Sequence, residues 1–193
     1  MRLGVLGGTF DPPHVGHLIA AGDAFESLAL DKLVFIPVAA QPLKTDAPAG
    51  ASPEQRLEMV RLAIQGDPRF SVSDTEIRRG GLSYTVDTLE TIKRENPAAT
   101  VFLIVGMDAL AGFERWKNPE RIRELAEIAV LSRTGERGVD AKVGGGVTVV
   151  GTRRIDISSS EIRQRLAAGK SIHGFVAESV ESYIATMKLY KSG

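Results

Sequence analysis

The chain has 193 residues, of which 43% are apolar and 25% are charged, a composition typical of globular proteins. Its 24 Lys and Arg balance its 24 Asp and Glu, so the charge favours neither a nucleic-acid partner nor an anionic membrane surface. The absence of cysteine excludes disulfides, thiolate metal sites and a cysteine nucleophile, and fits a cytoplasmic location. No signal peptide and no apolar run of the ~20 residues that span a membrane are expected.

Short apolar runs alternate with helical patterns along the chain. The predicted strands are LGVL (3–6), LVFIPV (33–38), RFSVS (69–73), TVFLIV (100–105), EIAVLS (127–132) and VTVV (147–150). Several of them are apolar throughout, as in strands buried on both faces of a parallel sheet. Strands alternating with helices predict an α/β fold, in which a doubly wound parallel sheet carries helices on both faces. We expect a single domain over residues 1–193.

Capping residues mark where several of the helices begin. A helix is expected after residue 14, another at the end of the chain (177–188), and further helix starts at Ser52-Pro53 with Gln55, at Ser83, at Asn118-Pro119 and at Ser158 with Glu161. Gly169 is expected to end the helix that Ser158 begins. Segments 38–52 and 134–146 are predicted to be mobile loops.

The segment GGTFDPPHVGH (7–17) follows the first predicted strand, where parallel sheets bind their ligands. Gly7 and Gly8 predict a sharp turn with room for a ligand. The helix after the turn offers free N–H groups and partial positive charge to a phosphate. His14 and His17 are three residues apart, so they share one helical face; each can donate to phosphate, and either can be charged near neutral pH.

The residues of this segment alone leave two interpretations open, a phosphate site and a purely structural turn. Neither the dinucleotide fingerprint G-x-G-x-x-G nor the P-loop pattern is present. A zinc site would need ligands beyond His14 and His17, and the chain offers one further histidine, His173, and no cysteine. We therefore predict no metal site built by the protein.

GGTFDPPHVGHL (7–18) resembles the signature of the nucleotidyltransferases with an H-x-G-H motif, and ISSSEIR (157–163) is similar to their C-terminal element. Within that superfamily the chain most resembles the bacterial nicotinate-nucleotide adenylyltransferases. IPVAAQPLK, RLEMVRLAI, LSYTVDTL, FLIVGMD, FERWKN and VESYIATMKLY occur in that family's order. The resemblance covers almost the whole chain and implies a Rossmann-like sheet.

The resemblance implies transfer of the adenylyl group of ATP to nicotinate mononucleotide, which gives deamido-NAD and pyrophosphate. The attack would be direct and in line, with no covalent intermediate. Because the nucleophile is an ionised phosphate, catalysis can depend on alignment and on neutralising the triphosphate charge, without a general base. ATP is then a substrate, and Mg²⁺ is expected to be held mainly by ATP oxygens and water.

The resemblance also implies roles for individual residues, with His17 the first candidate to hold the α-phosphate. The implied catalytic residues are His14, His17, Lys44 and Arg163. The implied ATP-binding residues are Gly7, Gly8, Thr9, Phe10, His14, His17, Gly106, Asp108, Ile157, Ser158, Ser159, Ser160 and Arg163. Local sequence leaves simpler roles open, because Asp108 could cap a helix and Ser158 could form a capping box.

The implied residues for the mononucleotide centre on Trp116, the single tryptophan, whose polar neighbours favour a stacking role over a core role. They are Thr9, Phe10, Lys44, Ser83, Tyr84, Thr85, Trp116, Lys117 and Arg133. The helix start at 83–85 could receive the nicotinate carboxylate on its N–H groups. A solvated side chain is an equally simple interpretation of Arg133.

Two positions depart from the family pattern, since Leu43 stands where a histidine is frequent and Val38 where an asparagine is frequent.

Two other functions stay open. One is a sister enzyme that uses nicotinamide mononucleotide or phosphopantetheine as acceptor, and the other is a non-catalytic nucleotide sensor, suggested by Leu43. The sequence leaves the oligomeric state, including a homo-oligomer, undecided.

Overall fold

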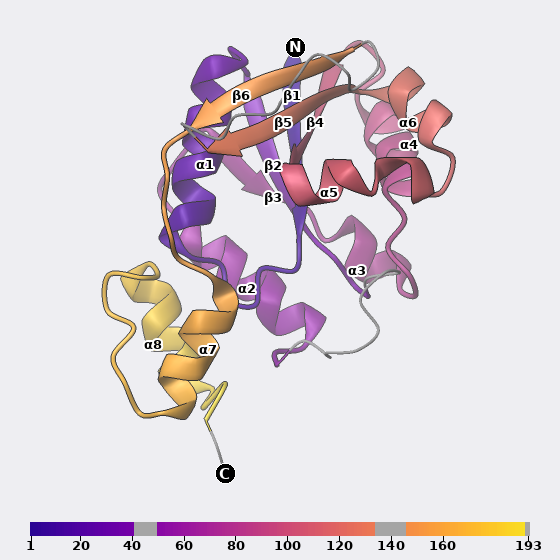
Figure 1. Ribbon diagram of the computed structural model, residues 1–193. Helices are drawn as coiled ribbons and strands as arrows, with labels where there is room; N and C mark the ends of the chain where they lie inside the picture. The colour runs from indigo at the N-terminus through magenta and orange to yellow at the C-terminus, as the bar shows by residue number, and fades with distance from the viewer. Residues whose placement is uncertain (41–49, 134–145, 192–193) are drawn as a thin grey trace.

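A computed structural model of the chain describes residues 1–40, 50–133 and 146–191 (Figure 1). Its six strands form one sheet in the order β3-β2-β1-β4-β5-β6, and every neighbouring pair is parallel. The strands are β1 (Arg2–Gly8), β2 (Lys32–Pro37), β3 (Phe70–Val72), β4 (Thr100–Gly106), β5 (Glu127–Arg133) and β6 (Val147–Thr152). The predicted Rossmann-like, doubly wound parallel sheet is confirmed.

Helices cover both faces of this sheet, as the alternation of elements predicts (Figure 1). One face carries α1 (Val15–Ser27) and α2 (Pro53–Ala63), and the other carries α4 (Thr85–Glu95) and α6 (Pro119–Leu125). Three short helices lie in the connections: α3 (Thr75–Arg79), α5 (Met107–Ala111) and the 3₁₀ helix η1 (Phe113–Arg115). In the described ranges, no helix has both the length and the apolar character needed to cross a bilayer.

The strands bury side chains on both faces, which explains their continuous apolar runs. In β2, Leu33 and Phe35 pack with α1 and α2, whereas Val34 and Ile36 pack with α4. The two-residue period of a strand therefore divides one run between two cores.

The C-terminal helices α7 (Ser159–Ala167) and α8 (Glu178–Thr186) form a third apolar cluster with α2, away from the sheet (Figure 1). Its buried members include Met59, Ile162, Val180 and Ile184. This cluster places the C-terminal part of the chain beside the segment that follows β1.

The predicted helix starts are confirmed at Ser52, whose hydroxyl accepts from Gln55 N (3.2 Å), and at Ser158, whose hydroxyl accepts from Glu161 N (3.1 Å). The predicted N-cap at Ser83 is wrong. Tyr84 occupies that position, because the Ser83 hydroxyl instead accepts the Ala39 N–H (3.0 Å) and ties the start of α4 to the end of β2.

Candidate active site

A cavity of about 520 Å³ opens at the carboxyl ends of β1 and β4. This is the edge at which parallel sheets bind ligands. It brings together residues that the sequence placed in both substrate sites, namely Gly7, Gly8, Ser83, Tyr84, Thr85, Gly106, Asp108, Trp116 and Lys117.

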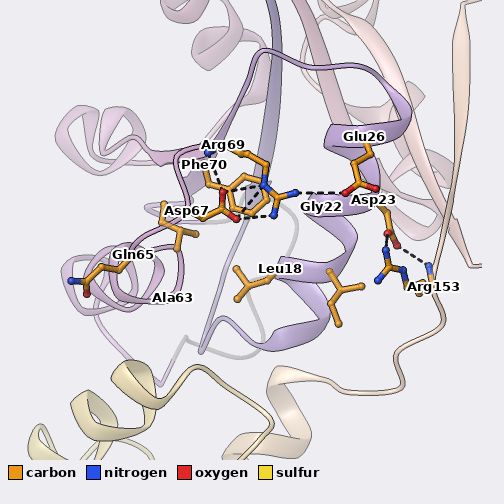
Figure 2. A pocket seen from close by; sticks show the side chains of 12 residues that line it. Leu18, Gly22, Asp23, Glu26, Ala63, Gln65, Asp67, Arg69, Phe70 and Arg153 are labelled. Carbon is orange, nitrogen blue, oxygen red and sulfur yellow. Dashed lines mark hydrogen bonds and ion pairs between the residues drawn. The ribbon is translucent and has the colours of Figure 1, made fainter.

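Another cavity, of about 340 Å³, lies between α1 and the segment that joins α2 to β3 (Figure 2). Its charged side chains are engaged with one another: Arg69 forms an ion pair with Asp67 (2.8 Å), and Arg153 with Asp23 (2.9 Å). None of the residues singled out from the sequence lines it. We therefore assign the chemistry to the larger cavity and its surroundings.

The turn between β1 and α1 is not made by its glycines. Gly7 and Gly8 both lie within β1, whereas Phe10 has a φ of 51° and the bond between Asp11 and Pro12 is cis. The predicted sharp turn at the two glycines is wrong. A Cβ at Gly8 would lie 2.8 Å from the Phe10 ring, while one at Gly7 would meet no protein atom within 4 Å, so Gly7 does leave room at the cavity.

His14 caps the start of α1, and its ring lies 3.8 Å from the ring of His17, centroid to centroid. The Nδ1 atom of His17 accepts the backbone N–H of His14 (3.2 Å). A neutral imidazole that accepts at Nδ1 carries its proton on Nε2. His17 therefore presents Nε2–H as its donor.

Burial lowers the pKa of His14 to about 4. Burial, followed by the charge of His14, lowers the pKa of His17 to about 3. Both rings are neutral at pH 7 in the free protein, so the expectation that either is charged near neutral pH is wrong for this state. The Nδ1 atom of His14 is buried and has no hydrogen-bond partner among the described residues.

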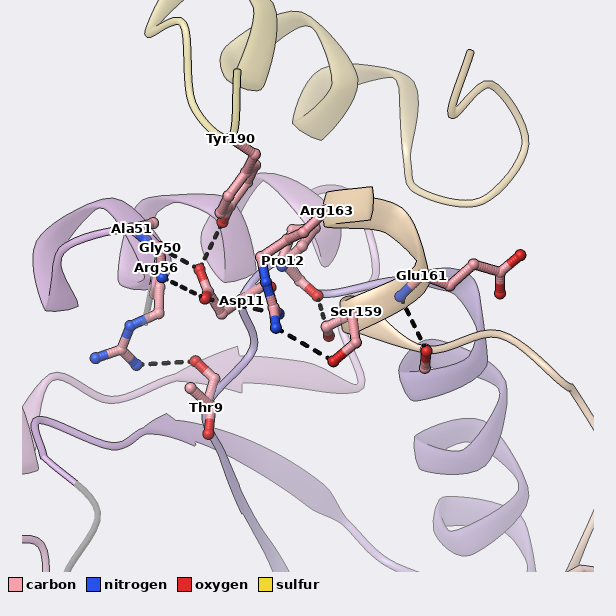
Figure 3. A network of polar contacts seen from close by, with 12 residues as sticks. Thr9, Asp11, Pro12, Gly50, Ala51, Arg56, Ser159, Glu161, Arg163 and Tyr190 are labelled. Carbon is pink, nitrogen blue, oxygen red and sulfur yellow. Dashed lines mark hydrogen bonds and ion pairs between the residues drawn. The ribbon is translucent and has the colours of Figure 1, made fainter. Parts of the chain in front are cut away.

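Helix α7 meets the histidine turn, as Figure 3 shows. Ser159 Oγ donates to the carbonyl of Pro12 (2.8 Å), and Arg163 Nη1 donates to the carbonyl of Asp11 (2.7 Å). Arg163 Nη2 also donates to Ser160 Oγ (3.2 Å). The two motifs, which are distant in the sequence, thus lie side by side. The side chains of Ser159 and Arg163 bind the backbone of the turn.

Among the residues that line the cavity, the half-buried Trp116 ring packs 5.3 Å from the ring of Phe113. Lys117 Nζ lies 4.6 Å from the centre of the Tyr84 ring and 3.1 Å from Asp87 Oδ1. These contacts join the Trp116 segment to the start of α4. An aromatic ring and a helix N-terminus therefore border the same space.

Comparison of the sequence with known proteins shows the family of the chain. The Cytidylyltransferase-like family model matches residues 5–165. A "Probable nicotinate-nucleotide adenylyltransferase" of Gemmatimonas aurantiaca is 45% identical over 99% of this chain and 93% of its own length. The chain belongs to the nicotinate-nucleotide adenylyltransferase family. A relative with the same printed name in Thermus thermophilus is 43% identical over 99% of this chain and all of its own length.

Solved structures of this family share the fold. Nicotinic acid mononucleotide adenylyltransferase of Plasmodium falciparum, complexed with NaAD, aligns with a TM-score of 0.78 at 18% identity, over 98% of this chain and 97% of its own. The structure of a "Putative Nicotinate-nucleotide Adenylyltransferase" from Vibrio parahaemolyticus aligns with a TM-score of 0.70 at 22% identity, over all of this chain and 98% of its own. These likenesses concern the fold.

Some expected family residues lie away from the cavity or outside the described part. Phe10 is buried, with its ring 5.1 Å from that of His17, and Ile157 packs against the third apolar cluster. The carbonyl of Thr9 accepts from Arg56 Nη1 (2.8 Å). Lys44, Leu43 and the side chain of Arg133 fall outside the described residues.

Arg56, which the sequence reasoning missed, is 2% exposed and joins the ends of β1 and β2. Its Nη1 donates to Thr9 and its Nη2 donates to the carbonyl of Ala39 (3.2 Å). Burial lowers the pKa of Arg56, and the charge of Asp11 opposes this effect. A signal was present, because Arg56 occupies the buried face of α2 three and four residues before Met59 and Val60.

Glu76 was also missed; it is 6% exposed and lines the cavity. Its Oε1 accepts from Thr88 Oγ1 (2.7 Å), and its Oε2 has no partner within the described ranges. Burial raises the pKa of Glu76, while the neighbouring hydroxyls of Ser83 and Thr88 oppose the rise. Glu76 lies on the five-residue helix α3, which is too short to show a helical period.

Proposed function

We propose that this chain transfers the adenylyl group of ATP to nicotinate mononucleotide and releases deamido-NAD and pyrophosphate. One observation carries the proposal: the histidine turn, the start of α7 and the cavity beside Trp116 meet at the same end of the sheet. The names of the curated relatives point to the same activity.

We assign the triphosphate to the region between the histidine turn and α7. His17 Nε2–H would donate to the α-phosphate, supported by the N–H groups at the start of α1. Arg163 would exchange its contacts with Asp11 and Ser160 for phosphate oxygens, where its guanidinium can bind two at once. Asp108 would accept from the ribose hydroxyls of ATP.

Nicotinate mononucleotide would occupy the cavity of about 520 Å³. Its pyridine ring would stack on Trp116, and its carboxylate would face the N–H groups at the start of α4 (Thr85–Glu95). An anion is favoured at that position, which gives a physical basis for preferring the acid to the amide.

In the reaction itself, a phosphate oxygen of the mononucleotide would attack the α-phosphorus of ATP. The bond from that phosphorus to the oxygen shared with the β-phosphate breaks, and pyrophosphate leaves with that electron pair. The nucleophile needs no deprotonation, so the residues act by alignment and by donating to oxygens that gain charge. Neutral His14 and His17 suit the donor role.

Mg²⁺ would neutralise the charge of the triphosphate. Asp11 in the histidine turn already accepts hydrogen bonds on both oxygens, from Gly50, Ala51 and Tyr190. In the described ranges, no three His, Asp or Glu side chains are grouped to hold a metal ion. We therefore propose that Mg²⁺ is held mainly by ATP oxygens and water. As a separate proposal, the reaction takes place in the cytoplasm.

The test is pyrophosphate release from ATP with three acceptors assayed side by side: nicotinate mononucleotide, nicotinamide mononucleotide and phosphopantetheine. We expect the highest kcat/KM with nicotinate mononucleotide. Faster turnover with another acceptor would assign the chain to a sister activity. Nucleotide binding without turnover of any acceptor would overturn the proposal in favour of a sensor.

A further inference from the structure

We propose that Tyr190 is a positioning residue for adenylyl transfer, acting through Asp11 on the turn that bears His14 and His17. This inference rests on the proposed function, to which it adds a residue outside the cavity lining. Tyr190 lies outside both sequence motifs (7–18 and 157–163), so neither motif indicates it.

Asp11 is the centre of the contact network that Figure 3 shows. Its side chain is buried, and its Oδ1 accepts from the Tyr190 hydroxyl (2.7 Å) and from Ala51 N (3.1 Å). Its Oδ2 accepts from Gly50 N (2.7 Å). A carboxylate removed from water is stable only when such donors surround it. The three donors therefore determine where Asp11, and the turn with it, can lie.

Arg163 is held through the same residue. Its Nη1 donates to the carbonyl of Asp11 and lies 3.8 Å from Asp11 Oδ2. In the ligand-free protein, displacing Asp11 would therefore move the histidine turn and also the guanidinium that is proposed to leave this carbonyl for phosphate. Asp11 lies three residues before His14, in the turn with the positive φ of Phe10.

The packing of α8 determines where the Tyr190 hydroxyl lies. Leu189 is buried in the third apolar cluster with α8, and the Tyr190 backbone turns at a φ of 62°. The Tyr190 ring packs over Gly50, where a Cβ would lie 2.9 Å from the ring. Burial raises the pKa of Tyr190, so its hydroxyl keeps the proton that Asp11 accepts.

A second contact from the C-terminal part supports this arrangement. The carbonyl of Phe175 accepts from Val15 N (2.9 Å), the first residue of α1. Residues near the C-terminal cluster thus bind the turn at both of its ends: Tyr190 binds Asp11, and Phe175 binds Val15. Misplacement of reacting groups by fractions of an ångström lowers rates strongly, so the hydroxyl of Tyr190 should affect kcat.

The test replaces Tyr190 by Phe, which keeps the ring over Gly50 and removes the hydroxyl. We expect kcat to fall about tenfold, with KM for nicotinate mononucleotide changed less than about twofold, since the cavity is untouched. The matched control is Tyr183→Phe, on α8 itself, which should keep the wild-type kcat. Wild-type kcat in Tyr190→Phe would overturn the inference.

A double-variant cycle tests whether Tyr190 acts through Asp11. If it does, Asp11→Asn combined with Tyr190→Phe should be no slower than Asp11→Asn alone. Independent, multiplying losses in kcat would contradict a shared path.

A readout independent of turnover separates this inference from the proposed function. NMR resonances of the histidine rings should shift for His14 and His17 in Tyr190→Phe, and stay unchanged for His173. Tyr183→Phe should shift neither of the first two. If the wild type turns over no acceptor, the proposed function fails while this measurement still decides the positioning role. Unshifted His14 and His17 rings in Tyr190→Phe would overturn it.

Discussion

At the scale of the residue, the direction of one hydrogen bond decides what His17 can do. Its Nδ1 accepts the backbone N–H of His14 at the start of α1, so Nε2 is the nitrogen left to donate to the proposed substrate. Burial keeps the ring neutral in the free protein. A triphosphate beside it would favour the charged form and raise both histidine pKa values.

Substitutions at His17 should separate the two nitrogens. Asn can accept in place of Nδ1 but offers no donor at the position of Nε2, whereas Gln can donate near Nε2. We expect His17→Asn and His17→Ala to lose about 100-fold or more in kcat, the range found when a transition-state donor is removed, and His17→Gln to lose less. Steady-state kinetics with both substrates saturating measures this. Equal losses in Asn and Gln variants would contradict the assignment of Nε2–H as the donor.

The lowered histidine pKa values also predict how stability depends on pH. In the unfolded chain both rings gain protons below about pH 6.5, whereas the folded rings stay neutral down to about 4 for His14 and about 3 for His17. The unfolded state therefore binds more protons in this window. As the pH is lowered below about 6.5, the free energy of unfolding should therefore decrease, by about 1.4 kcal/mol per pH unit for each histidine.

Urea unfolding at pH 7.0 and 5.0 tests this expectation. The double variant His14→Gln/His17→Gln should lose less stability than the wild type between the two pH values. His173→Gln is the comparison variant, because His173 is an exposed histidine that pairs with Glu181 (3.3 Å) outside the histidine turn. Identical pH dependence in the wild type and the double variant would contradict the neutral, buried histidines.

At the scale of the element, α2 contrasts a buried arginine with an exposed one. Arg56 is buried and holds two carbonyls, whereas Arg61 pairs with Glu58 in solvent. Arg56→Met should lower the free energy of unfolding by about 3 kcal/mol, because it leaves buried acceptors without donors and the charge of Asp11 less compensated. Arg61→Met, the matched control, should change it by less than about 0.5 kcal/mol. Chemical denaturation compares the two; similar small losses would contradict a structural role for Arg56.

The regular elements could be predicted from sequence because their signals are local. Apolar runs marked the six strands, and the hydroxyl of Ser52 marked the start of α2. The turn after β1 could not be predicted, since its shape depends on Phe10 fitting against Gly8 and not on glycine dihedral freedom. The Ser83 cap failed because a contact with the distant Ala39 took its hydroxyl.

The candidate site residues could be named from the sequence, whereas the contacts that hold them in place could not. The resemblance to a family indicated His14, His17 and Trp116, and the fold brings them to one end of the sheet. Arg56 and Tyr190 act across long sequence separations, which no local period reveals. Their roles follow from burial and hydrogen bonding in the folded chain.

At the scale of the whole molecule, the two proposed substrate regions lie on different supports. The triphosphate region is built from the turn after β1 and α7, and the nicotinate end of the cavity from α4 and the segment at Trp116. Asp108, just after β4, lines the same cavity and is proposed to hold the ribose of ATP. A change confined to one region should therefore affect one substrate more than the other.

Trp116 allows this division to be tested. Trp116→Ala should raise KM for nicotinate mononucleotide about tenfold or more, the effect of losing an aromatic stacking partner, with KM for ATP changed little. Trp116→Phe should have a KM for nicotinate mononucleotide between those of the wild type and Trp116→Ala. Because Trp116 is the single tryptophan, its fluorescence in the wild type should change on adding nicotinate mononucleotide. Equal increases of KM for both substrates would contradict separate regions.

The contact between Asp11 and Tyr190 joins positions 179 apart in the chain. During translation the histidine turn emerges from the ribosome well before its partner, because Tyr190 is added 179 positions after Asp11. A nascent chain can form β1 and α1 well before residue 190 exists, but the turn between them then lacks one of its donors. Each new molecule should therefore reach its full rate only after residue 190 has been synthesised and has packed against Asp11.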